Sequence, residues 1–476
     1  MPINSFIYPS QVKLLDYEVA NSCRLNRGDS PYMSKTHGSA GNQRTFTVSF
    51  WYKRTNFGEK EVIMSTTDGG SSFFSIGFTG SGTYVDKFFI YWYDGSSPAT
   101  DYGYFSTRLF RDVSAWYHVV LAVDTTQGTE SDRVKLYING TLESLTAVYA
   151  AFPENHDTYF NKDNVHYIAY DHDSASAALN GYLAELVIID GTQYAASDFG
   201  EFDEDSPTIW KPIDVSGLTF GTNGAYLDFE DSSNLGNDAN GGTDWTESNL
   251  AATDQATDTP TNNFCTLNPL YNNSLVYAEG NCKITEAGDW QSSFSTIGAT
   301  SGKWYMEFKC SASTDGADNF SGGICALDGV SDAAIALTVP GGSGSSIISY
   351  GYENDATKDV KNTSSSYGST YGSASTDIIG VYMDLDNNKL YFAKNGTVQD
   401  SGTGISIDDG YTYGFTVGDY YGTSEANFGN PTFSISSGNA DANGYGNFEY
   451  DPSSGTFDSA SKDFYALCTK NLAEFG

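Results

Sequence analysis

The feature that most constrains the fold is an Asn-Gly pair that occurs twice in closely similar settings. Residues 135–143 read KLYINGTLE, and residues 389–399 read KLYFAKNGTVQ. Both central positions of a tight β-hairpin turn need positive φ, which Asn and Gly tolerate, so each pair predicts a hairpin. The two copies are roughly 250 residues apart, which indicates two domains of comparable build rather than a short-period repeat.

Alternating runs rich in β-branched and aromatic residues surround the first hairpin, and turn residues separate them. The segment 177–189 contains helix-forming residues, but Asn180 and Gly181 would fall inside that helix, so a buried strand is the better interpretation. The sequence therefore predicts strands at residues 45–53, 73–78, 87–93, 116–124, 134–139 and 183–190.

Composition supports the same fold class. The chain has 34 Tyr, 29 Phe and 50 Gly, and 39% of its residues are hydrophobic, which suits strands, tight turns and a large core. We predict an all-β protein with two antiparallel, jelly-roll-like β-sandwich domains joined by a short irregular seam. The expected parts are an N-terminal anchor or edge segment (1–20), a first sandwich (21–210), the seam (211–265) and a second sandwich (266–476).

The charge balance excludes several partners. Asp and Glu number 60 against 24 Lys and Arg, a formal net charge of −36. Nucleic acid and anionic membrane surfaces would repel such a chain, so neither is expected as a partner. Residues 1–19 lack the basic cluster and apolar run of a secretory signal, and no apolar run approaches the length that spans a bilayer.

The six cysteines are too scattered for a disulfide framework, and none forms a C-x-x-C pair. Cys310 and Cys325 flank a predicted hairpin and could face each other across it. In a reducing compartment, buried free thiols are the preferred interpretation.

Three motifs in the first half resemble the laminin-G and concanavalin-A-like lectin/glucanase sandwich. They are WYHVV at 116–120, KLYING at 135–140 and LNGYLAELVIIDG at 179–191, and the resemblance covers residues 21–205. It implies the sandwich fold and says little about activity.

The second half resembles a SPRY sandwich. The matching runs are SGKWYMEF at 301–308, SGGICAL at 321–327, ISYGY at 348–352 and DLDNNKLYFAKNG at 384–396, within residues 267–472.

The pairing of the two sandwiches, with connecting runs at 199–203, 209–212, 227–229 and 258–269, resembles tail-fibre and other virion proteins of marine bacteriophages. This resemblance implies a non-enzymatic structural or adhesion protein of the virion, assembled in the host cytoplasm, that binds a host surface glycan or protein. A head-decorating protein without a receptor role is the alternative. The implied partners are other virion proteins and further copies of the chain, and residues 1–20 are the candidate anchor or an edge strand.

A glycoside hydrolase is the rival class, because some sandwiches of this kind carry alternating catalytic carboxylates. Glu201, Asp203 and Asp205 are the near match, and period two would place them on one face of a strand. A proline follows at position 207 and the run lies beyond the last lectin-like strand, so an acidic loop is expected. No catalytic residue is predicted.

Asp171 and Asp173 are candidate ligands for calcium, because loop carboxylates and carbonyls supply the hard oxygen ligands that it prefers. A solvated acidic turn is the alternative, and no other cofactor is expected.

Aromatic side chains are the candidate ligand-binding residues, because they bury a large area at low entropic cost. Ordinary cross-strand packing is the alternative for each of them. The candidates are Tyr91, Trp92, Tyr93, Tyr102 and Tyr104 in the first sandwich, and Tyr367, Tyr371, Tyr420 and Tyr421 in the second.

Overall fold

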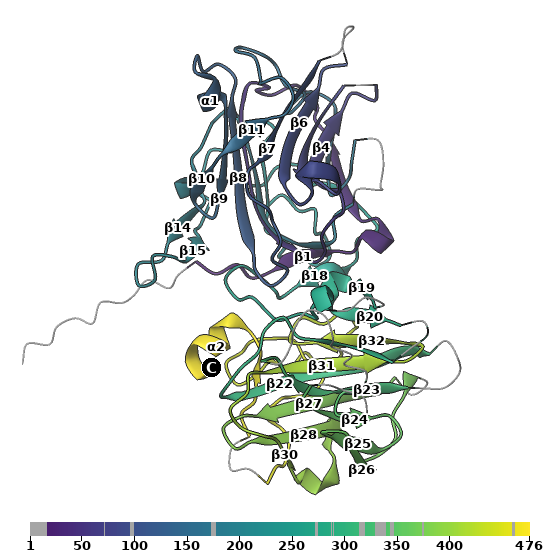
Figure 1. The fold of residues 1–476 in the computed structure, drawn as a ribbon. Helices are drawn as coiled ribbons and strands as arrows, with labels where there is room; N and C mark the ends of the chain where they lie inside the picture. The colour runs from purple at the N-terminus through teal and green to yellow at the C-terminus, as the bar shows by residue number, and fades with distance from the viewer. Residues whose placement is uncertain are drawn as a thin grey trace, which may run out of the picture.

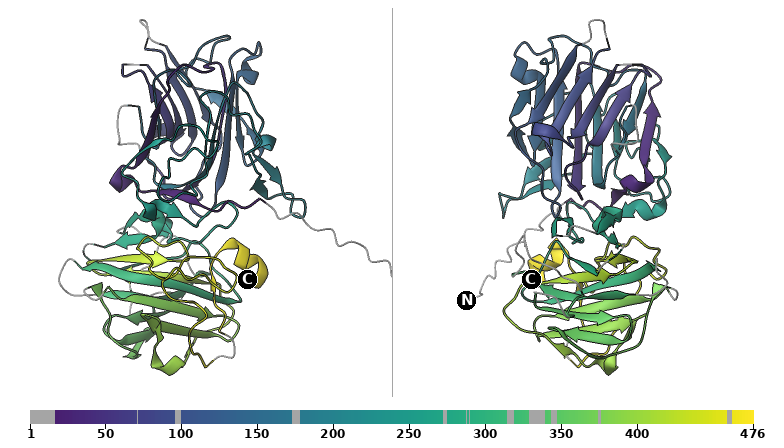
Figure 2. Two further views of the ribbon diagram at one scale, coloured as in Figure 1. Left: turned by 180° about the vertical axis from the view of Figure 1, so that it is seen from behind. Right: turned by 45° about the vertical axis from the view of Figure 1, so that its right-hand side comes forward.

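In the computed structural model of the chain, strands form two bodies stacked end to end, the first above the second in Figure 1. Both views of Figure 2 show the same narrow junction between them. The structure describes residues 17–70, 72–95, 100–172, 178–271, 275–286, 288, 290–313, 319–328, 339–342, 347–373, 376–458 and 462–476.

Helix is scarce in the described residues. The α-helices there are α1 (Glu130–Arg133) and α2 (Thr469–Phe475), and α2 lies beside the junction (Figure 1). None of the described helices has the length and apolar character needed to cross a membrane. The predicted all-β fold of antiparallel sandwiches is therefore confirmed.

Sheet I is one layer of the first sandwich. Its order is β10-β9-β8-β3-β13-β1-β18, with β16 also pairing with β13. At its centre, all ten residues of β13 are buried, because segments of the chain cover both faces. The strands of sheet I are β1 (Ser22–Leu25), β3 (Thr45–Arg54), β8 (Tyr117–Asp124), β9 (Val134–Ile138), β10 (Thr141–Glu143), β13 (Gly181–Asp190), β16 (Ala225–Leu227) and β18 (Gln255–Ala256).

Sheet II is the facing layer, in the order β11-β7-β6-β5-β4-β12-β2-β17. Phe74 and Ile76 of β5 and Phe88 and Ile90 of β6 join the core between the sheets, so the residues that alternate with them lie on the outer face. The strands of sheet II are β2 (Tyr32–Thr36), β4 (Glu61–Thr67), β5 (Phe73–Phe78), β6 (Phe88–Tyr93), β7 (Asp101–Ser106), β11 (Leu145–Ala147), β12 (Val165–Ile168) and β17 (Thr246–Ser248).

The second sandwich consists of sheets III and IV. Sheet III has the order β19-β20-β32-β22-β27-β28-β29, and in addition β30 pairs with β28 and β33 pairs with β22. Sheet IV has the order β21-β31-β23-β24-β25-β26. The strands of sheet III are β19 (Val276–Ala278), β20 (Lys283–Thr285), β22 (Lys303–Ser313), β27 (Ile378–Asp384), β28 (Lys389–Lys394), β29 (Thr397–Val398), β30 (Ile405–Ser406), β32 (Gly422–Asn427) and β33 (Tyr465–Ala466). Those of sheet IV are β21 (Gln291–Phe294), β23 (Phe320–Ala326), β24 (Ser349–Glu353), β25 (Thr357–Val360), β26 (Thr363–Ser366) and β31 (Tyr413–Asp419).

Both Asn-Gly hairpins are confirmed, and they share a second function. Asn139 and Asn395 each have φ of 47° and are followed by a glycine at 75°, as a tight hairpin turn requires. The side-chain oxygen of Asn139 accepts a hydrogen bond from His118 N at 2.8 Å, and that of Asn395 accepts one from Ile378 N at 2.9 Å. Each asparagine therefore ties its turn to the start of the neighbouring strand.

The six strands predicted in the first half are also confirmed. Strands β3, β5, β6, β8, β9 and β13 match the predicted runs to within two residues at either end. The residues predicted as an irregular seam, 211–265, instead supply β16 and β18 to sheet I and β17 to sheet II, while β15 (Trp210–Pro212) pairs with β14 (Gly200–Phe202) in a separate hairpin. Backbone groups in this polar stretch thus complete the edges of the first sandwich.

The cysteines behave as buried hydrophobic residues. All six lie in the described part of the chain, are buried and form no disulfide. Cys310 lies in β22 of sheet III and Cys325 in β23 of sheet IV, so they do not flank one hairpin, and the preferred interpretation of buried free thiols is confirmed for both.

A buried charge crosses the junction between the sandwiches. The ammonium of Lys53, in β3, donates to Asp258 Oδ2 at 2.6 Å, Asn263 Oδ1 at 2.7 Å and the Phe264 carbonyl at 2.8 Å. The side chains of Lys53 and Asp258 are both fully buried. The other oxygen of Asp258 accepts a hydrogen bond from Trp116 Nε1 at 3.1 Å. The chain therefore enters the second sandwich beside a buried lysine whose ammonium donates three hydrogen bonds.

Further polar contacts extend this junction. Arg24, 1% exposed, donates to the carbonyls of Thr253 and Pro431 at 2.6 and 2.9 Å. The Tyr182 hydroxyl donates to the Gly280 carbonyl at 3.0 Å and accepts from Asn430 Nδ2 at 3.2 Å. A Cβ at position 280 would lie 2.0 Å from that hydroxyl, so only glycine permits this approach. These contacts fix the orientation of the two sandwiches.

A second buried charge lies at a β-bulge in β13. The register with β3 shifts between Ala184 and Val187, and Glu185 within the bulge has φ of 48°. Its carboxylate accepts hydrogen bonds from the hydroxyls of Tyr17 and Tyr226 at 3.1 and 2.8 Å. Burial is the main cause that raises the pKa of Glu185 from 4.5 to about 7.

We predict that Lys53→Met lowers the free energy of unfolding by about 3–5 kcal/mol, because it leaves the carboxylate of Asp258 buried without its cation. Chemical denaturation measures this. The matched control is Lys361→Met, whose partner Asp408 is 42% exposed and whose loss should change stability far less. Equal effects of the two substitutions would contradict the role given to Lys53.

A pH-dependent prediction follows from Glu185. Because its pKa is raised in the folded protein, the stability it contributes is complete below pH 4.5 and is lost as the pH rises to about 7. Unfolding free energies of the wild type and Glu185→Gln, measured by denaturant titration, should therefore diverge. The wild type should lose about 3 kcal/mol relative to the variant across this range, whereas parallel profiles would refute the assignment.

Candidate functional site

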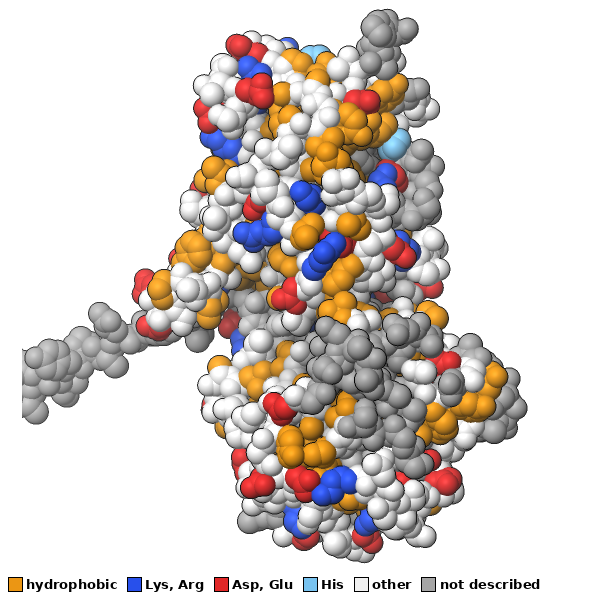
Figure 3. Space-filling model, in the orientation of Figure 1, with side chains coloured by type: hydrophobic (Ala, Val, Ile, Leu, Met, Phe, Trp, Pro, Cys, Tyr) orange, Lys and Arg blue, Asp and Glu red, His pale blue; other side chains and the backbone are white. Residues whose placement is uncertain are grey.

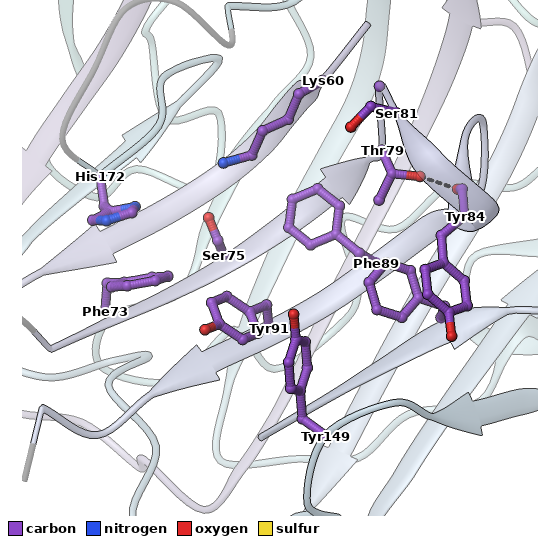
Figure 4. Close-up of a pocket in the computed structure, with 12 residues that line it drawn as sticks. Lys60, Phe73, Ser75, Thr79, Ser81, Tyr84, Phe89, Tyr91, Tyr149 and His172 are labelled. Carbon is purple, nitrogen blue, oxygen red and sulfur yellow. Dashed lines mark hydrogen bonds between the residues drawn. The ribbon is translucent and has the colours of Figure 1, made fainter. Parts of the chain in front are cut away.

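A groove of about 510 Å³ lies on the outer face of sheet II. Figure 3 shows hydrophobic side chains gathered over the strands of this sheet in the upper body. The groove, called the aromatic groove below, is lined by Lys60, Phe73, Ser75, Thr79, Gly80, Ser81, Tyr84, Phe89, Tyr91, Phe105, Tyr149 and His172 (Figure 4).

Strand alternation builds the floor of the aromatic groove. Phe73 and Ser75 come from β5, Phe89 and Tyr91 from β6, and Phe105 from β7, each between neighbours that point into the core. The turn after β5, including the 3-10 helix η2 (Gly82–Tyr84), closes one end. The hydroxyl of Thr79 donates to the Tyr84 carbonyl and fixes that turn (Figure 4).

The rings in the aromatic groove support one another. His172 stacks on Phe73 at 3.5 Å between centroids and an angle of 8°, and Tyr84 stacks on Phe105 at 4.5 Å. Tyr91 lies 5.1 Å from Tyr149, which is 43% exposed. The groove therefore presents a row of pre-arranged rings.

Two local features fix Tyr91 and Tyr149. A Cβ on Gly103 would lie 3.2 Å from the rings of both tyrosines and 2.8 Å from the Ile90 carbonyl, so a glycine there allows the rings to approach the sheet. The Tyr91 hydroxyl donates to Asp101, and burial together with this hydrogen bond raises its pKa well above the ordinary value. Tyr91 thus stays a neutral, immobilised ring.

The polar groups cluster at the end near His172. The Ser75 side chain is 1% exposed, and its hydroxyl has no hydrogen-bond partner within the described protein. Figure 4 shows this hydroxyl and the ammonium of Lys60 pointing into the same end of the groove, between the rings of His172 and Phe89. The Lys60 side chain is 48% exposed, and its ammonium lies 5.9 Å from the centroid of Phe89.

Asp171, predicted as a calcium ligand, has a different role. Its carboxylate is hydrogen-bonded to Lys60 through one oxygen and to the ring and backbone nitrogens of His172 through the other. Burial raises its pKa, but the hydrogen bonds from His172 and Lys60 outweigh burial and the pKa lies below the ordinary value. Asp173 lies outside the described residues, and among the described side chains no group of three or more His, Cys, Asp or Glu could hold a metal ion.

The aromatic candidates of the first sandwich divide between the two faces of sheet II. Tyr91 lines the aromatic groove, and Tyr93 lies beside it, 5.8 Å from Phe73. Trp92 and Tyr104 are 1% and 7% exposed and belong to the core, and Tyr102 stacks on Trp92 against that core. Trp92 and Tyr104 are therefore core residues and not surface stacking residues, because they alternate with the outward-facing positions, whereas Tyr102 is half-buried.

The candidates in the second sandwich are also divided. Tyr367 and Tyr371, predicted on a loop surface, are 4% and 5% exposed and pack in the core of that sandwich. The Tyr371 hydroxyl donates to the Tyr352 carbonyl at 2.6 Å, so it serves the fold. Tyr420 and Tyr421 form the turn between β31 and β32, half-buried, with their rings 4.8 Å apart.

Most residues of the aromatic groove were not predicted from the sequence. Phe73 and Phe89 lie in predicted strands, and their alternation with core positions could have indicated the outer face. The same alternation applies to Ser75, whereas Lys60, Tyr149 and His172 carried no local signal. They meet through the pairing of strands and loops far apart in the chain.

The acidic run considered for glycoside hydrolysis lies away from the aromatic groove. Glu201 is in β14 and is exposed, and Lys211 lies 3.5 Å from its carboxylate. Asp203 accepts hydrogen bonds from the backbone nitrogens of Asp205 and Ser206 at 3.0 and 2.8 Å. These contacts make the run the turn of the β14–β15 hairpin, as expected for an acidic loop.

A comparison with known protein families matches part of the first half of the chain. The family model Laminin_G_3, described as the concanavalin A-like lectin/glucanases superfamily, matches residues 27–196, which include the whole lining of the aromatic groove. The lectin-like first half is therefore supported. No curated protein matches the chain.

Three solved structures are similar. The SPRY domain of human HERC1 has 15% identity and a TM-score of 0.26, covering 34% of this chain and 96% of that one. A putative carbohydrate binding protein from Bacteroides ovatus has 16% identity and a TM-score of 0.34, covering 48% and 58%. The LG1-3 region of the laminin alpha2 chain has 9% identity and a TM-score of 0.33, covering 85% and 60%.

The contacts of Asp171 lead to a prediction about calcium. Because both carboxylate oxygens already serve Lys60 and His172, millimolar calcium should give no rise in melting temperature that depends on Asp171. Thermal unfolding of the wild type and Asp171→Asn, with calcium and with chelator, measures this. A calcium-induced rise that disappears in the variant would restore the calcium site.

Proposed function

We propose that the chain is a non-enzymatic carbohydrate-binding protein whose glycan lies in the aromatic groove. The observation that carries the proposal is the row of fixed rings in a surface groove, with hydroxyl and amino groups at one end. One face of a sugar ring is apolar and packs against aromatic rings, while its hydroxyl groups need hydrogen-bonding partners. Rings and polar groups occur together in this groove.

The lining of the groove favours binding over hydrolysis. Glycoside hydrolysis requires two carboxyl groups, about 5–9.5 Å apart, on either side of the bond. Within the described part of the chain, the residues that line the groove include neither Asp nor Glu. The matching family model is described as a lectin/glucanases superfamily, which includes both binding proteins and hydrolases, so the preference for binding rests on the lining of the groove.

The groove is open, so a single site would bind a glycan weakly. Several copies of the chain on one assembly would convert weak sites into high avidity. We therefore include homo-oligomerisation in the proposal.

We also propose that the chain is a structural or adhesion protein of a bacteriophage particle. It rests on the resemblance of the two-sandwich arrangement to virion proteins, and it includes attachment to other virion proteins and recognition of a host surface. Decoration of the head without a receptor role is the alternative. Mass spectrometry of purified virions tests this part, and absence of the chain from the particle would remove it without affecting glycan binding.

We predict that Tyr91→Ala lowers affinity for a bound oligosaccharide about tenfold or more, because it removes the central ring of the groove. Tyr91→Phe keeps the ring and should retain most of the affinity. A glycan array identifies the ligand, and titration calorimetry then measures each variant.

The matched control is Tyr420→Ala, which removes a ring from the second sandwich. Loss of binding in Tyr420→Ala with retention in Tyr91→Ala would move the site to the turn between β31 and β32. Equal melting temperatures show that the variants are folded.

A further inference from the structure

The charge of the aromatic groove differs from that of the whole chain. The chain carries a formal charge of −36, yet the described residues that line the groove include one lysine and one histidine and no carboxylate. The summed charge of the protein opposes an anionic ligand at long range, and the scarcity of carboxylates at this site lowers that repulsion locally.

The cation in the groove is held where a ligand could meet it. Asp171 forms an ion pair with Lys60, and its side chain is only 7% exposed, while that of Lys60 is 48% exposed. The lysine ammonium carries three donor hydrogens, and Asp171 accepts one of them. Asp171 thus orients Lys60 while leaving donors directed at the groove.

The hydroxyl of Ser75 supplies an independent indication of a ligand. It is buried at the floor of the groove and lacks a hydrogen-bond partner in the described protein, a condition that calls for an explanation in a native structure. It points into the same end of the groove as the Lys60 ammonium (Figure 4). Two donors beside stacked rings match a carboxylate attached to a sugar ring.

We propose, resting on the carbohydrate-binding function above, that the groove selects an acidic sugar, a uronate. Its ring lies against Phe89, Tyr91 and Tyr149, and its carboxylate accepts hydrogen bonds from Lys60 Nζ and Ser75 Oγ. A neutral sugar would keep the ring contacts and lose the contact with the ammonium.

The test compares each uronate oligosaccharide with its own carboxyl-reduced form, which differs only in having a primary alcohol in place of the carboxylate. Oligogalacturonate, oligomannuronate and oligoglucuronate form the panel, with affinities measured by titration calorimetry. At least one uronate should bind about tenfold or more tightly than its reduced form. Equal affinity for both forms would overturn the acidic-sugar inference and leave glycan binding intact, whereas binding of no glycan on the array would overturn the proposed function itself.

Variants of the donors test the geometry. Lys60→Met should abolish the preference for the uronate over its reduced form, and Lys60→Arg should restore part of the preference. Ser75→Ala should weaken uronate binding by a smaller factor.

The matched control is Lys135→Met, which removes the same charge from β9 of sheet I, where Lys135 pairs with Asp132 at 3.3 Å. Lys135→Met should retain the full preference. Equal losses in Lys60→Met and Lys135→Met would show that net charge alone is responsible and would overturn the inference.

Discussion

The arrangement of the two sandwiches depends on one buried ammonium group. Lys53 lies on the face of β3 opposite the core of the first sandwich, and its three acceptors all come from the segment that leads into the second. A buried ion pair adds little net stability over a well-packed apolar contact, but it tolerates few alternative arrangements because an unsatisfied charge is costly. Lys53 and Asp258 thus define how the bodies meet, and the contacts of Arg24 and Tyr182 follow from that placement.

Sheet II shows how one strand pattern serves both stability and recognition. In β5 and β6, aromatic residues occupy both faces, so Phe74 and Phe88 fill the core while Phe73 and Phe89 line the aromatic groove. Aromatic rings on an outer sheet face would ordinarily be an aggregation hazard. Here the turn at η2, Tyr149 and His172 border them and confine the apolar surface to a groove.

Residues adjacent in the sequence were sufficient to predict the strands and hairpins, but they were not sufficient to predict which residues line the aromatic groove. The turns at Asn139 and Asn395 depend on their own backbone angles, so adjacent residues predict them. Whether Trp92 or Tyr91 faces the solvent depends on which face of β6 meets sheet I, and that is a property of the whole sandwich. Asp171 resembled a metal ligand because its cation, Lys60, is more than a hundred residues away in sequence. The polar stretch before residue 265 seemed irregular because its strands are only two or three residues long.

The six buried thiols give the molecule an internal set of chemical reporters. Cys23 lies in the first sandwich, Cys265, Cys282 and Cys468 adjoin the junction, and Cys310 and Cys325 lie within the second sandwich. A thiol shielded from water reacts with an alkylating reagent only when the segment around it opens. The order in which these positions become labelled would therefore record which body opens first, without any introduced probe.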